Sequence, residues 1–364
     1  MAGIYVHIPF CTAKCAYCDF FSVPRLQLVE NVVRAIGREW MLRKPEIERP
    51  ETLYIGGGTP SLLSSESFTT LTEQLPALPL TEFTVEVNPD DVVADKAGAW
   101  LQAGVNRISM GVQSFCDDEL NAVGRRHSAA TAINAYRFLR NIGFNNLSLD
   151  LIYGLPGQTL RSWKYSVDTL LDLRPEHISA YLLSVEPGTR LFARKSVGKF
   201  TETDDDTVQQ MYTYLCNATE RAGYQHYEIS NFALPGKRAV HNSSYWAFKP
   251  YVGLGPAAHS YGSDRLRRIN PSNINAYLSA IESGQTAYTV EEETDTDRIN
   301  DRIMVALRTS EGLDLSTLPP SVQDTLMASL RHIPPGYIIR GNDNIRIPEN
   351  RFLVSDAIIR ELFI

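Results

Sequence analysis

The sequence predicts an α/β protein, a partial (β/α)6 barrel followed by a smaller C-terminal helical, winged-helix-like domain. Short β-branched or apolar runs alternate with longer amphipathic segments from residue 3 to about residue 184, which is typical of βα units and a parallel sheet. The length of 364 residues exceeds what one small core organises and favours a large domain plus a lesser one. In such barrels the functional site lies at the carboxyl ends of the strands.

Six strands and the helices between them make up the predicted barrel. The strands are expected at Gly3–Ile8, Thr52–Gly56, Phe83–Asn88, Arg107–Val112, Leu147–Tyr153 and His177–Leu183. The intervening helices are expected at Gln27–Leu42, Ser61–Gln74, Asp95–Ala103, Ala129–Ile142 and Leu160–Leu173, and a further helix at Thr207–Ala222.

Beyond the barrel we expect a connecting region and a C-terminal domain, with boundaries at 1–225, 226–290 and 291–364. Residues 226–262 are rich in aromatic residues, glycine and histidine, and little regular structure can be predicted there. The last segment is typical of a helix at Arg298–Arg308, a second helix, and a hairpin of Tyr337–Arg340 with Asn344–Ile347. Its basic residues form no one-sided stripe, which favours packing against the barrel over binding to DNA.

Composition narrows the class of protein. No apolar run approaches the roughly 20 residues of a membrane span, and no leader pattern precedes the first strand. Five cysteines, three of them clustered, fit a reducing compartment, so we expect a cytoplasmic protein. The net charge of −7 disfavours nucleic acid as a partner. The two remaining cysteines, Cys116 and Cys216, are expected to be packed rather than reactive.

Three cysteines, Cys11, Cys15 and Cys18, lie within eight residues directly behind the apolar run Ile4–Ile8. Clustered thiolates are soft ligands suited to a metal ion or a cluster. A four-iron cluster usually takes four cysteines, so a set of three leaves one iron open for another ligand. The alternatives are zinc with His7 as a fourth ligand, or reduced cysteines packed as small apolar side chains. Zinc sites usually combine two short hairpin-like ligand segments, and the sequence has no second one, so it favours the cluster over zinc.

Glycines and polar residues follow the predicted strands on the same edge. Gly56–Pro60 follows the second strand, where glycines let the backbone approach a ligand closely. Glu86 and Gln113 end the third and fourth strands, and Asp150 interrupts the apolar run of the fifth. Arg125 can add a cation to this set. Since buried polar groups need partners, the set predicts a ring of ligand contacts, with loop capping or pairing to neighbours as the alternative for each.

Several motifs together carry a family resemblance. The spacing Cys-x3-Cys-x2-Cys with Tyr17 before the last cysteine resembles the signature of the radical SAM superfamily, in which S-adenosylmethionine (SAM) occupies the free iron. The chain is similar over nearly its whole length to the group that contains oxygen-independent coproporphyrinogen III oxidases (HemN type) and radical SAM haem chaperones (HemW type). The motifs are Tyr5–Cys11, Gly56–Pro60, Ser109–Phe115 and Asp150–Gly157.

The resemblance implies a [4Fe-4S] cluster on the three cysteines and a set of SAM contacts. Carried over by motif position, these contacts are Tyr5, Tyr17, Gly57, Gly58, Thr59, Glu86, Gln113, Arg125 and Asp150. Some of them serve a second SAM molecule in the oxidases, so the resemblance leaves the number of SAM molecules open.

Two departures separate the chain from the oxidases and match the chaperones. Phe20 stands where the oxidase motif has a fourth cysteine, and the first cluster cysteine is already residue 11, without the long extension that precedes it in the oxidases. The chaperone branch also carries a His-Asn-x-x-Tyr-Trp motif associated with haem binding, which is His241–Trp246 here. A histidine beside two aromatic residues can offer iron an imidazole and the porphyrin a stacking surface. The alternative to a haem ligand is a loop histidine that is hydrogen-bonded in a domain junction.

These features predict a haem chaperone that binds a [4Fe-4S] cluster, SAM and haem and passes haem to apo-haemoproteins. An enzyme of the coproporphyrinogen oxidase type is the alternative. Oxidase activity is not expected, whereas SAM cleavage, peripheral membrane contact and the oligomeric state are left open by the sequence.

Overall fold

The computed structural model describes residues 2–47, 49–76, 79–262, 264 and 266–364. They form two compact units, Met1–Asp204 with Ala239–Glu291, and Asp205–Arg238 with Glu292–Ile364. This division differs from the expected boundaries at 225 and 290. The chain leaves the first unit before α8 (Asp205–Arg221), returns at Ala239, and leaves again after β12 (Thr289–Glu291), so neither unit is one continuous stretch.

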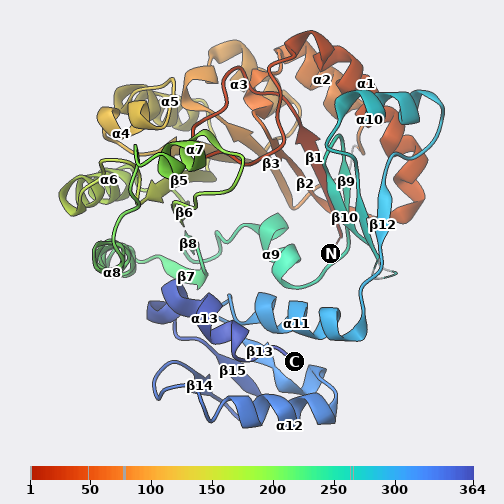
Figure 1. The fold of residues 1–364 in the computed structure, drawn as a ribbon. Coiled ribbons are helices and arrows are strands. Elements are labelled where there is room, and N and C mark those ends of the chain that lie inside the picture. Colours follow the sequence, from red (N-terminus) through yellow and green to blue (C-terminus); the bar gives the residue numbers. More distant parts are fainter. Residues whose placement is uncertain (1, 48, 77–78, 263, 265) are drawn as a thin grey trace. The chain divides into compact units, whose positions relative to one another are not determined.

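The first unit confirms the predicted barrel of six parallel strands. The strands pair in sequence order and are β1 (Ala2–Ile8), β2 (Pro50–Gly57), β3 (Glu82–Val87), β4 (Arg107–Gln113), β5 (Leu147–Tyr153) and β6 (His177–Leu182). The helices run along the outer side of the curved sheet in Figure 1, and are α1 (Val29–Arg43), α2 (Ser65–Glu73), α3 (Ala94–Gln102), α5 (Ala129–Asn141) and α6 (Leu160–Leu173). Two short helices, α4 (Asp117–Ala122) and α7 (Arg190–Ser196), were not predicted.

Side chains alternate along each barrel strand between an apolar outer face and a polar inner face. Outer residues such as Ile4, Val6 and Ile108 are fully buried. Inner residues bond across neighbouring strands: the Tyr54 hydroxyl donates to Glu86 at 2.7 Å, and Ser148 Oγ lies 2.7 Å from His177 Nδ1. The barrel therefore has an apolar layer between its strands and the surrounding helices, and a polar interior.

The capping box of α6 gives a local test of the fold. The Thr159 side chain accepts from Ser162 N at 3.1 Å, and Ser162 Oγ accepts from Thr159 N at 2.9 Å. Because T159A leaves helix-end amides without their partner, we expect it to lower the free energy of unfolding by about 1 kcal/mol. T169A, inside the same helix, is the control and should be neutral or slightly stabilising. Urea unfolding followed by circular dichroism measures both, and equal losses would contradict the capping role.

Little regular structure can be predicted for residues 226–262, yet the chain from Tyr251 onward extends the sheet. Within the first unit, β9 (Tyr251–Leu254) pairs in parallel with β1, and antiparallel strands continue from it to the edge in the order β10, β11, β12. The remaining elements are β10 (His259–Tyr261), β11 (Arg267–Ile269), α9 (Val240–Trp246) and α10 (Ile274–Glu282). Here the short strands lack long alternating runs, which is why their periodicity escaped prediction.

A buried carboxylate ties this sheet extension to the barrel helices. Glu39 of α1 is fully buried, and its carboxylate accepts from Gly255 N at 2.8 Å and from the Tyr277 hydroxyl at 2.7 Å. Asn270 Nδ2 and Arg43 Nη1 complete the network at 2.8 and 3.3 Å. Since a buried charge is tolerated only when it is paired and hydrogen-bonded, this network fixes the loop after β9 against α1.

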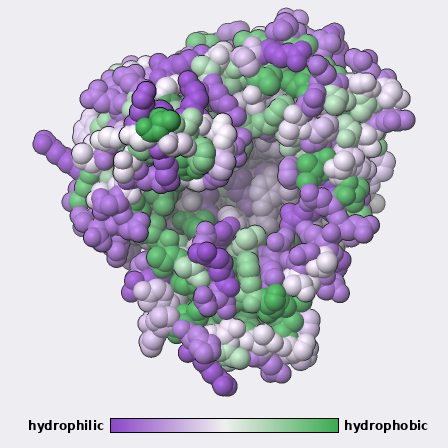
Figure 2. Space-filling view, in the orientation of Figure 1, coloured by the Kyte–Doolittle hydropathy of each residue, from purple (hydrophilic) through white to green (hydrophobic). Residues whose placement is uncertain are grey.

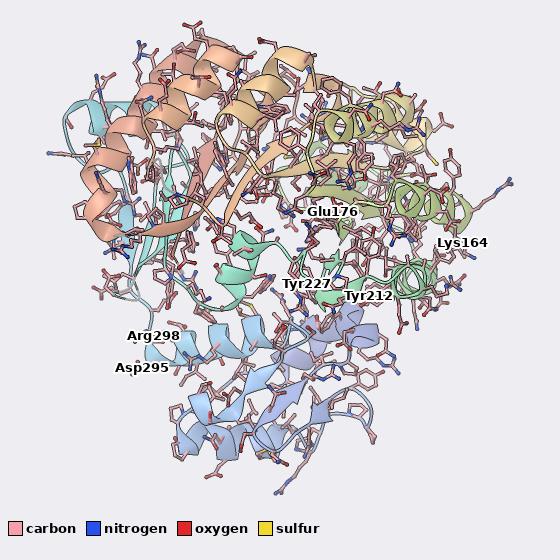
Figure 3. All side chains as sticks on the ribbon, turned by 180° about the vertical axis from the view of Figure 1, so that it is seen from behind. Lys164, Glu176, Tyr212, Tyr227, Asp295 and Arg298 are labelled. Atoms are coloured by element: carbon pink, nitrogen blue, oxygen red, sulfur yellow. The ribbon has the colours of Figure 1, made fainter. Side chains whose placement is uncertain are left out.

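The second unit confirms the expected helix, helix and hairpin at the C-terminus. It contains α8, the hairpin β7 (Gln225–Glu228) and β8 (Asn231–Ala233), and an antiparallel sheet in the order β13-β15-β14, with α11 (Asp295–Ala306), α12 (Pro320–Ser329) and α13 (Ser355–Arg360). The sheet strands are β13 (Leu313–Asp314), β14 (Ile339–Arg340) and β15 (Asn344–Arg346). Tyr212 of α8 and Tyr227 of β7 are labelled in Figure 3, as are Asp295 and Arg298 in the first turn of α11.

Hydrophilic side chains cover most of the molecular face drawn in Figure 2, with apolar residues scattered between them. Among the described residues, no helix is long and apolar enough to span a bilayer.

Candidate functional site

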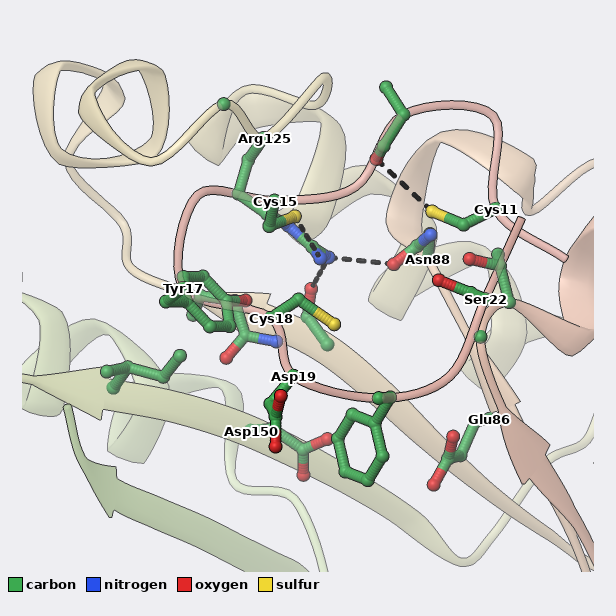
Figure 4. Close-up of a pocket in the computed structure, with 18 of the residues that line it drawn as sticks. Cys11, Cys15, Tyr17, Cys18, Asp19, Ser22, Glu86, Asn88, Arg125 and Asp150 are labelled. Carbon is green, nitrogen blue, oxygen red and sulfur yellow. Dashed lines mark hydrogen bonds between the residues drawn. The ribbon is translucent and has the colours of Figure 1, made fainter. Parts of the chain in front are cut away.

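A cavity of about 430 Å³ opens at the carboxyl ends of the barrel strands. All three clustered cysteines line it, together with eight of the nine residues expected to contact SAM: Tyr17, Gly57, Gly58, Thr59, Glu86, Gln113, Arg125 and Asp150. Figure 4 shows the cysteine loop above the strand ends, with Glu86 and Asp150 below it. The residues singled out from sequence therefore converge on one site.

The cysteine loop is held in place by backbone bonds at both ends and in its middle. Cys11 N donates to Val23 O at 3.2 Å, and Val23 N donates to Pro9 O at 3.0 Å. In the middle, Ala16 N donates to Val123 O at 2.9 Å. Tyr17 packs against apolar clusters on both sides of the loop. Because its backbone is fixed this way, the loop presents its thiols to the cavity without needing to order on ligand binding.

The three thiols suit a cluster better than a single ion. No three His, Cys, Asp or Glu side chains in the described part of the chain converge on one ion position, whereas each cysteine of a cubane binds a different iron. His7, the alternative zinc ligand, is buried, with Nε2 2.9 Å from Phe21 O and Nδ1 3.1 Å from the Tyr5 hydroxyl. Both ring nitrogens are thus engaged away from the thiols. Burial also raises the pKa of the Cys18 thiol, a cost that metal binding offsets.

The glycine turn after β2 needs its glycines for space and conformation. Gly57 has φ of +109°, which other residues rarely adopt, and a Cβ on Gly58 would lie 2.5 Å from Phe10 O. The next residue, Thr59, has a buried Oγ1 without a hydrogen-bond partner among the described residues. A turn that brings backbone this close to the cluster loop, and leaves a buried hydroxyl unsatisfied, fits a polar ligand.

Two half-buried carboxylates set the electrostatics below the loop. Glu86 accepts from the Tyr54 hydroxyl at 2.7 Å and from Gly57 N at 3.1 Å. Burial and the charge of Asp150 raise the pKa of Glu86 to about 7, although both hydrogen bonds oppose the shift. Burial likewise raises the pKa of Asp150. A ligand that donates hydrogen bonds or carries positive charge would stabilise the charged form of these carboxyl groups. The ammonium and sulfonium groups of SAM would do so.

Arg125 connects the cysteine loop to the strand ends. Its Nη2 donates to Asn88 Oδ1 at 2.8 Å and to Gly111 O at 2.5 Å, and its Nη1 lies 3.6 Å from Cys15 Sγ, as the dashed lines of Figure 4 show. The guanidinium thereby places a positive charge beside the cysteine loop, where it can pair with the negative charge of a bound cluster. Arg125 Nε is buried without a partner among the described residues, which leaves a donor available to a bound anion.

Gln113 is held in a strained backbone conformation at the end of β4. Its φ is +69°, and the β4–β5 register shifts between Gly111 and Gln113. A Cβ on Gly111 would lie 2.8 Å from Gln113 Nε2, so the glycine makes room for this side chain. Strain at a non-glycine residue is concentrated at functional sites, where it aims a side chain.

Two of the expected contacts lie elsewhere. Tyr5 does not line the cavity, because its hydroxyl bonds to His7. His241, the expected haem ligand, is 1% exposed, with Nδ1 2.8 Å from Thr52 Oγ1 and Nε2 2.7 Å from the Tyr245 hydroxyl. Burial lowers its pKa to about 3, so the ring is neutral, yet it has no free nitrogen. In this conformation the hydrogen-bonded alternative describes His241, because both ring nitrogens already have partners, and its role as a haem ligand stays a prediction.

Sequence reasoning missed Asn88 as a site residue. Its Oδ1 orients Arg125, and it lines the cavity just after β3. The sequence could have indicated this role, since Asn88 is a polar residue at the end of the third strand, and polar residues also end the neighbouring strands.

Comparisons with known proteins agree with this site. The Radical SAM superfamily matches residues 5–170. The chain is 38% identical over 323 residues to Heme chaperone HemW of Bacillus subtilis, covering 86% of this chain and 85% of the relative. It is 38% identical over 267 residues to Heme chaperone HemW of Escherichia coli, covering 71% and 69%. Coproporphyrinogen III oxidase (HemN) from Escherichia coli superimposes with a TM-score of 0.85 at 23% identity, over 100% of this chain and 90% of that structure, which shows a common fold.

A six-stranded parallel barrel with three loop cysteines over a glycine turn defines a radical SAM core, whose cofactors are a [4Fe-4S] cluster and SAM. Within that superfamily, the chain belongs to the heme chaperone HemW family.

Proposed function

We propose that the protein is a cytoplasmic haem chaperone that holds a [4Fe-4S] cluster and SAM, binds haem, and delivers it to apo-haemoproteins. The observation that carries the proposal is the 38% identity to Heme chaperone HemW across 86% of the chain. The cavity supports it, because the residues expected for both cofactors gather there.

In this proposal Cys11, Cys15 and Cys18 ligate the cluster, and SAM lies between the glycine turn and the carboxylates of Glu86 and Asp150. The cluster supplies an open iron that the amino and carboxylate groups of SAM can bind. Arg125 places its positive charge beside the cluster loop, while Glu86 and Asp150 face the positive end of SAM. The first unit then holds both cofactors.

Phe20 bears on the choice between chaperone and oxidase. It stands where the resemblance places a fourth cysteine, and its side chain is 66% exposed at the cavity lining. An adenosyl radical reacts with the wrong partner unless water and bystanders are kept out. An exposed apolar side chain at this position suits contact with a partner or a porphyrin better than radical chemistry on a buried substrate.

Haem handover gives the test. Reconstituted protein is loaded with haem and mixed with an apo-haemoprotein while the Soret spectrum of the recipient is followed. Delivery by contact predicts a transfer rate that rises with recipient concentration, whereas passive loss predicts a rate fixed by haem dissociation alone. Absence of haem binding by protein with an intact cluster would refute the proposal. In parallel, coproporphyrinogen III with SAM and reductant should yield no protoporphyrinogen, and robust decarboxylation would favour the oxidase.

A further inference from the structure

We infer that His259 is an axial ligand of haem iron, on a sheet face where Arg267 accompanies the haem propionates. The inference rests on the proposed haem binding and assigns the ligand that His241 cannot supply in this structure. It starts from the histidines that iron can reach.

The chain has seven histidines, all of them among the described residues. Four are buried, namely His7, His127, His177 and His241. His226 is partly buried in the second unit, where its ring stacks on Phe232 with centroids 4.0 Å apart. Only His259 and His332 are exposed. Haem is a flat molecule whose iron takes an axial ligand from one side, so a reachable imidazole nitrogen is the first requirement.

The imidazole of His259 meets that requirement. It stands at the start of β10, and neither of its ring nitrogens has a hydrogen-bond partner among the described residues. Partial burial and the charge of Arg267 lower its pKa, with Glu291 opposing the shift. The ring is therefore neutral near pH 7, which is the form that binds iron.

The face around His259 suits a porphyrin. His259 and Tyr261 share one side of β10, because Ser260 between them points to the other side, where its hydroxyl accepts from Arg43 at 3.0 Å. Tyr261 pairs with Tyr251 on β9 and lies 6.1 Å from Phe248, centroid to centroid. Aromatic side chains grouped beside an imidazole give a macrocycle a surface to stack on.

Charge on the same face suits propionates. Arg267 is opposite Tyr261 on β11, and its guanidinium carbon lies 5.6 Å from the centre of the Tyr261 ring. Glu291 is opposite Arg267 on β12 and competes with an incoming carboxylate. Arginine remains charged at all relevant pH values and matches carboxylates in geometry, so it selects haem with free propionates over its neutral ester.

In this arrangement the His241–Trp246 motif positions an aromatic side chain beside the proposed haem face. Val240 N and His241 N donate to Glu82 at 2.8 and 3.0 Å, which fixes the start of α9. His241 Nε2 in turn lies 2.7 Å from the Tyr245 hydroxyl, and Tyr245 packs edge-on against Tyr251 at 4.6 Å between centroids. His241 is thus a positioning residue that holds an aromatic side chain against the face on which His259 stands.

His332 is the weaker candidate and provides the matched control. It follows α12 in the second unit, next to Arg331. The nearby ring of Tyr337 is already covered by Arg351, whose guanidinium carbon lies 4.7 Å from the ring centre. No aromatic contact of His332 is found in the described part of the chain.

Haem titration of full-length, cluster-loaded protein separates these possibilities. H259A should weaken haem binding about tenfold or more and shift the Soret band, whereas H332A should match the unsubstituted protein. H259G gives a stricter test, because free imidazole should enter the vacated space and restore the original spectrum. Failure of all variants and of the unsubstituted protein to bind haem refutes the proposed function. Normal binding and an unchanged spectrum in H259A refute the ligand assignment alone.

The propionate contact has its own readout. The unsubstituted protein should bind haem more tightly than haem dimethyl ester, and R267Q should remove most of that preference, a change of about threefold to tenfold. R302Q, on α11, should leave the preference intact. A preference for the free acid that persists in R267Q would place the propionates elsewhere.

Discussion

Cys15→Ser protein purified without oxygen should be nearly colourless, with iron and sulfide contents at least about tenfold below those of the unsubstituted protein. The reason is that a cubane on three thiolates already has one open iron, and removal of a further ligand leaves two. Cys11→Ser and Cys18→Ser should behave alike, because all three thiols line the same cavity. Iron and sulfide assays with visible spectroscopy provide the measurement.

The chain contains its own controls for this experiment. Cys116 and Cys216 lie outside the loop, and burial raises the pKa of both thiols, that of Cys216 to about 11. Their serine variants should retain the colour and the iron. Circular dichroism should show unchanged secondary structure in the loop variants, since none of the three cysteines is fully buried. A colourless unsubstituted protein with one zinc ion per chain would overturn the cluster assignment.

The barrel could be predicted because its strands repeat one signal at regular spacing. Leu147–Tyr153 and Leu160–Leu173 were predicted with the bounds that the structure has. The site residues followed from topology, since parallel strands bring their carboxyl ends to one edge. Glu86, Gln113 and Asp150 are far apart in sequence, yet all three line the cavity.

The errors have a different physical origin. Short strands such as β10 and β11 are stabilised by neighbours rather than by their own sequences. Glu39 holds the loop before β10 and Asn270, the residue after β11, through long-range hydrogen bonds. The ring nitrogens of His241 are hydrogen-bonded to Thr52 and Tyr245, and Thr52 is 189 positions away in sequence. A motif tells which side chains are present, but not whether a ring nitrogen is already bonded.

Glu86→Gln should make the cofactor-free protein more stable at pH 8 while weakening its binding of SAM. In the unfolded chain Glu86 has a pKa near the ordinary value of 4.5, and in the folded protein burial raises it to about 7. The protonated carboxyl is compatible with folding below pH 4.5. Between pH 4.5 and about 7 the unfolded chain loses its proton first, so stability falls across this interval and is constant above it.

A shift of that size corresponds to about 3 kcal/mol, and water entering the open cavity reduces it, so we expect E86Q to gain about 1 to 2 kcal/mol at pH 8 and nothing at pH 4. Glutamine retains an oxygen that can accept from Gly57 N, and its amide nitrogen can donate to the Tyr54 hydroxyl, so both partners are kept. Asp150 keeps its own raised pKa and leaves a residual pH dependence. Urea unfolding across this pH range measures the difference, with exposed Glu66→Gln as the control.

The gain in stability should be matched by a loss of function. At pH 8 the carboxylate of Glu86 is charged in the apo-protein although its partial burial disfavours the charge, and a cationic, hydrogen-bond-donating ligand offsets this cost on binding. Loss of that charge in E86Q should weaken SAM binding to the cluster-loaded protein by about tenfold to a hundredfold, measured by calorimetry. If E86Q instead bound SAM normally and lost stability at pH 8, Glu86 would be a structural residue and SAM would contact other parts of the cavity.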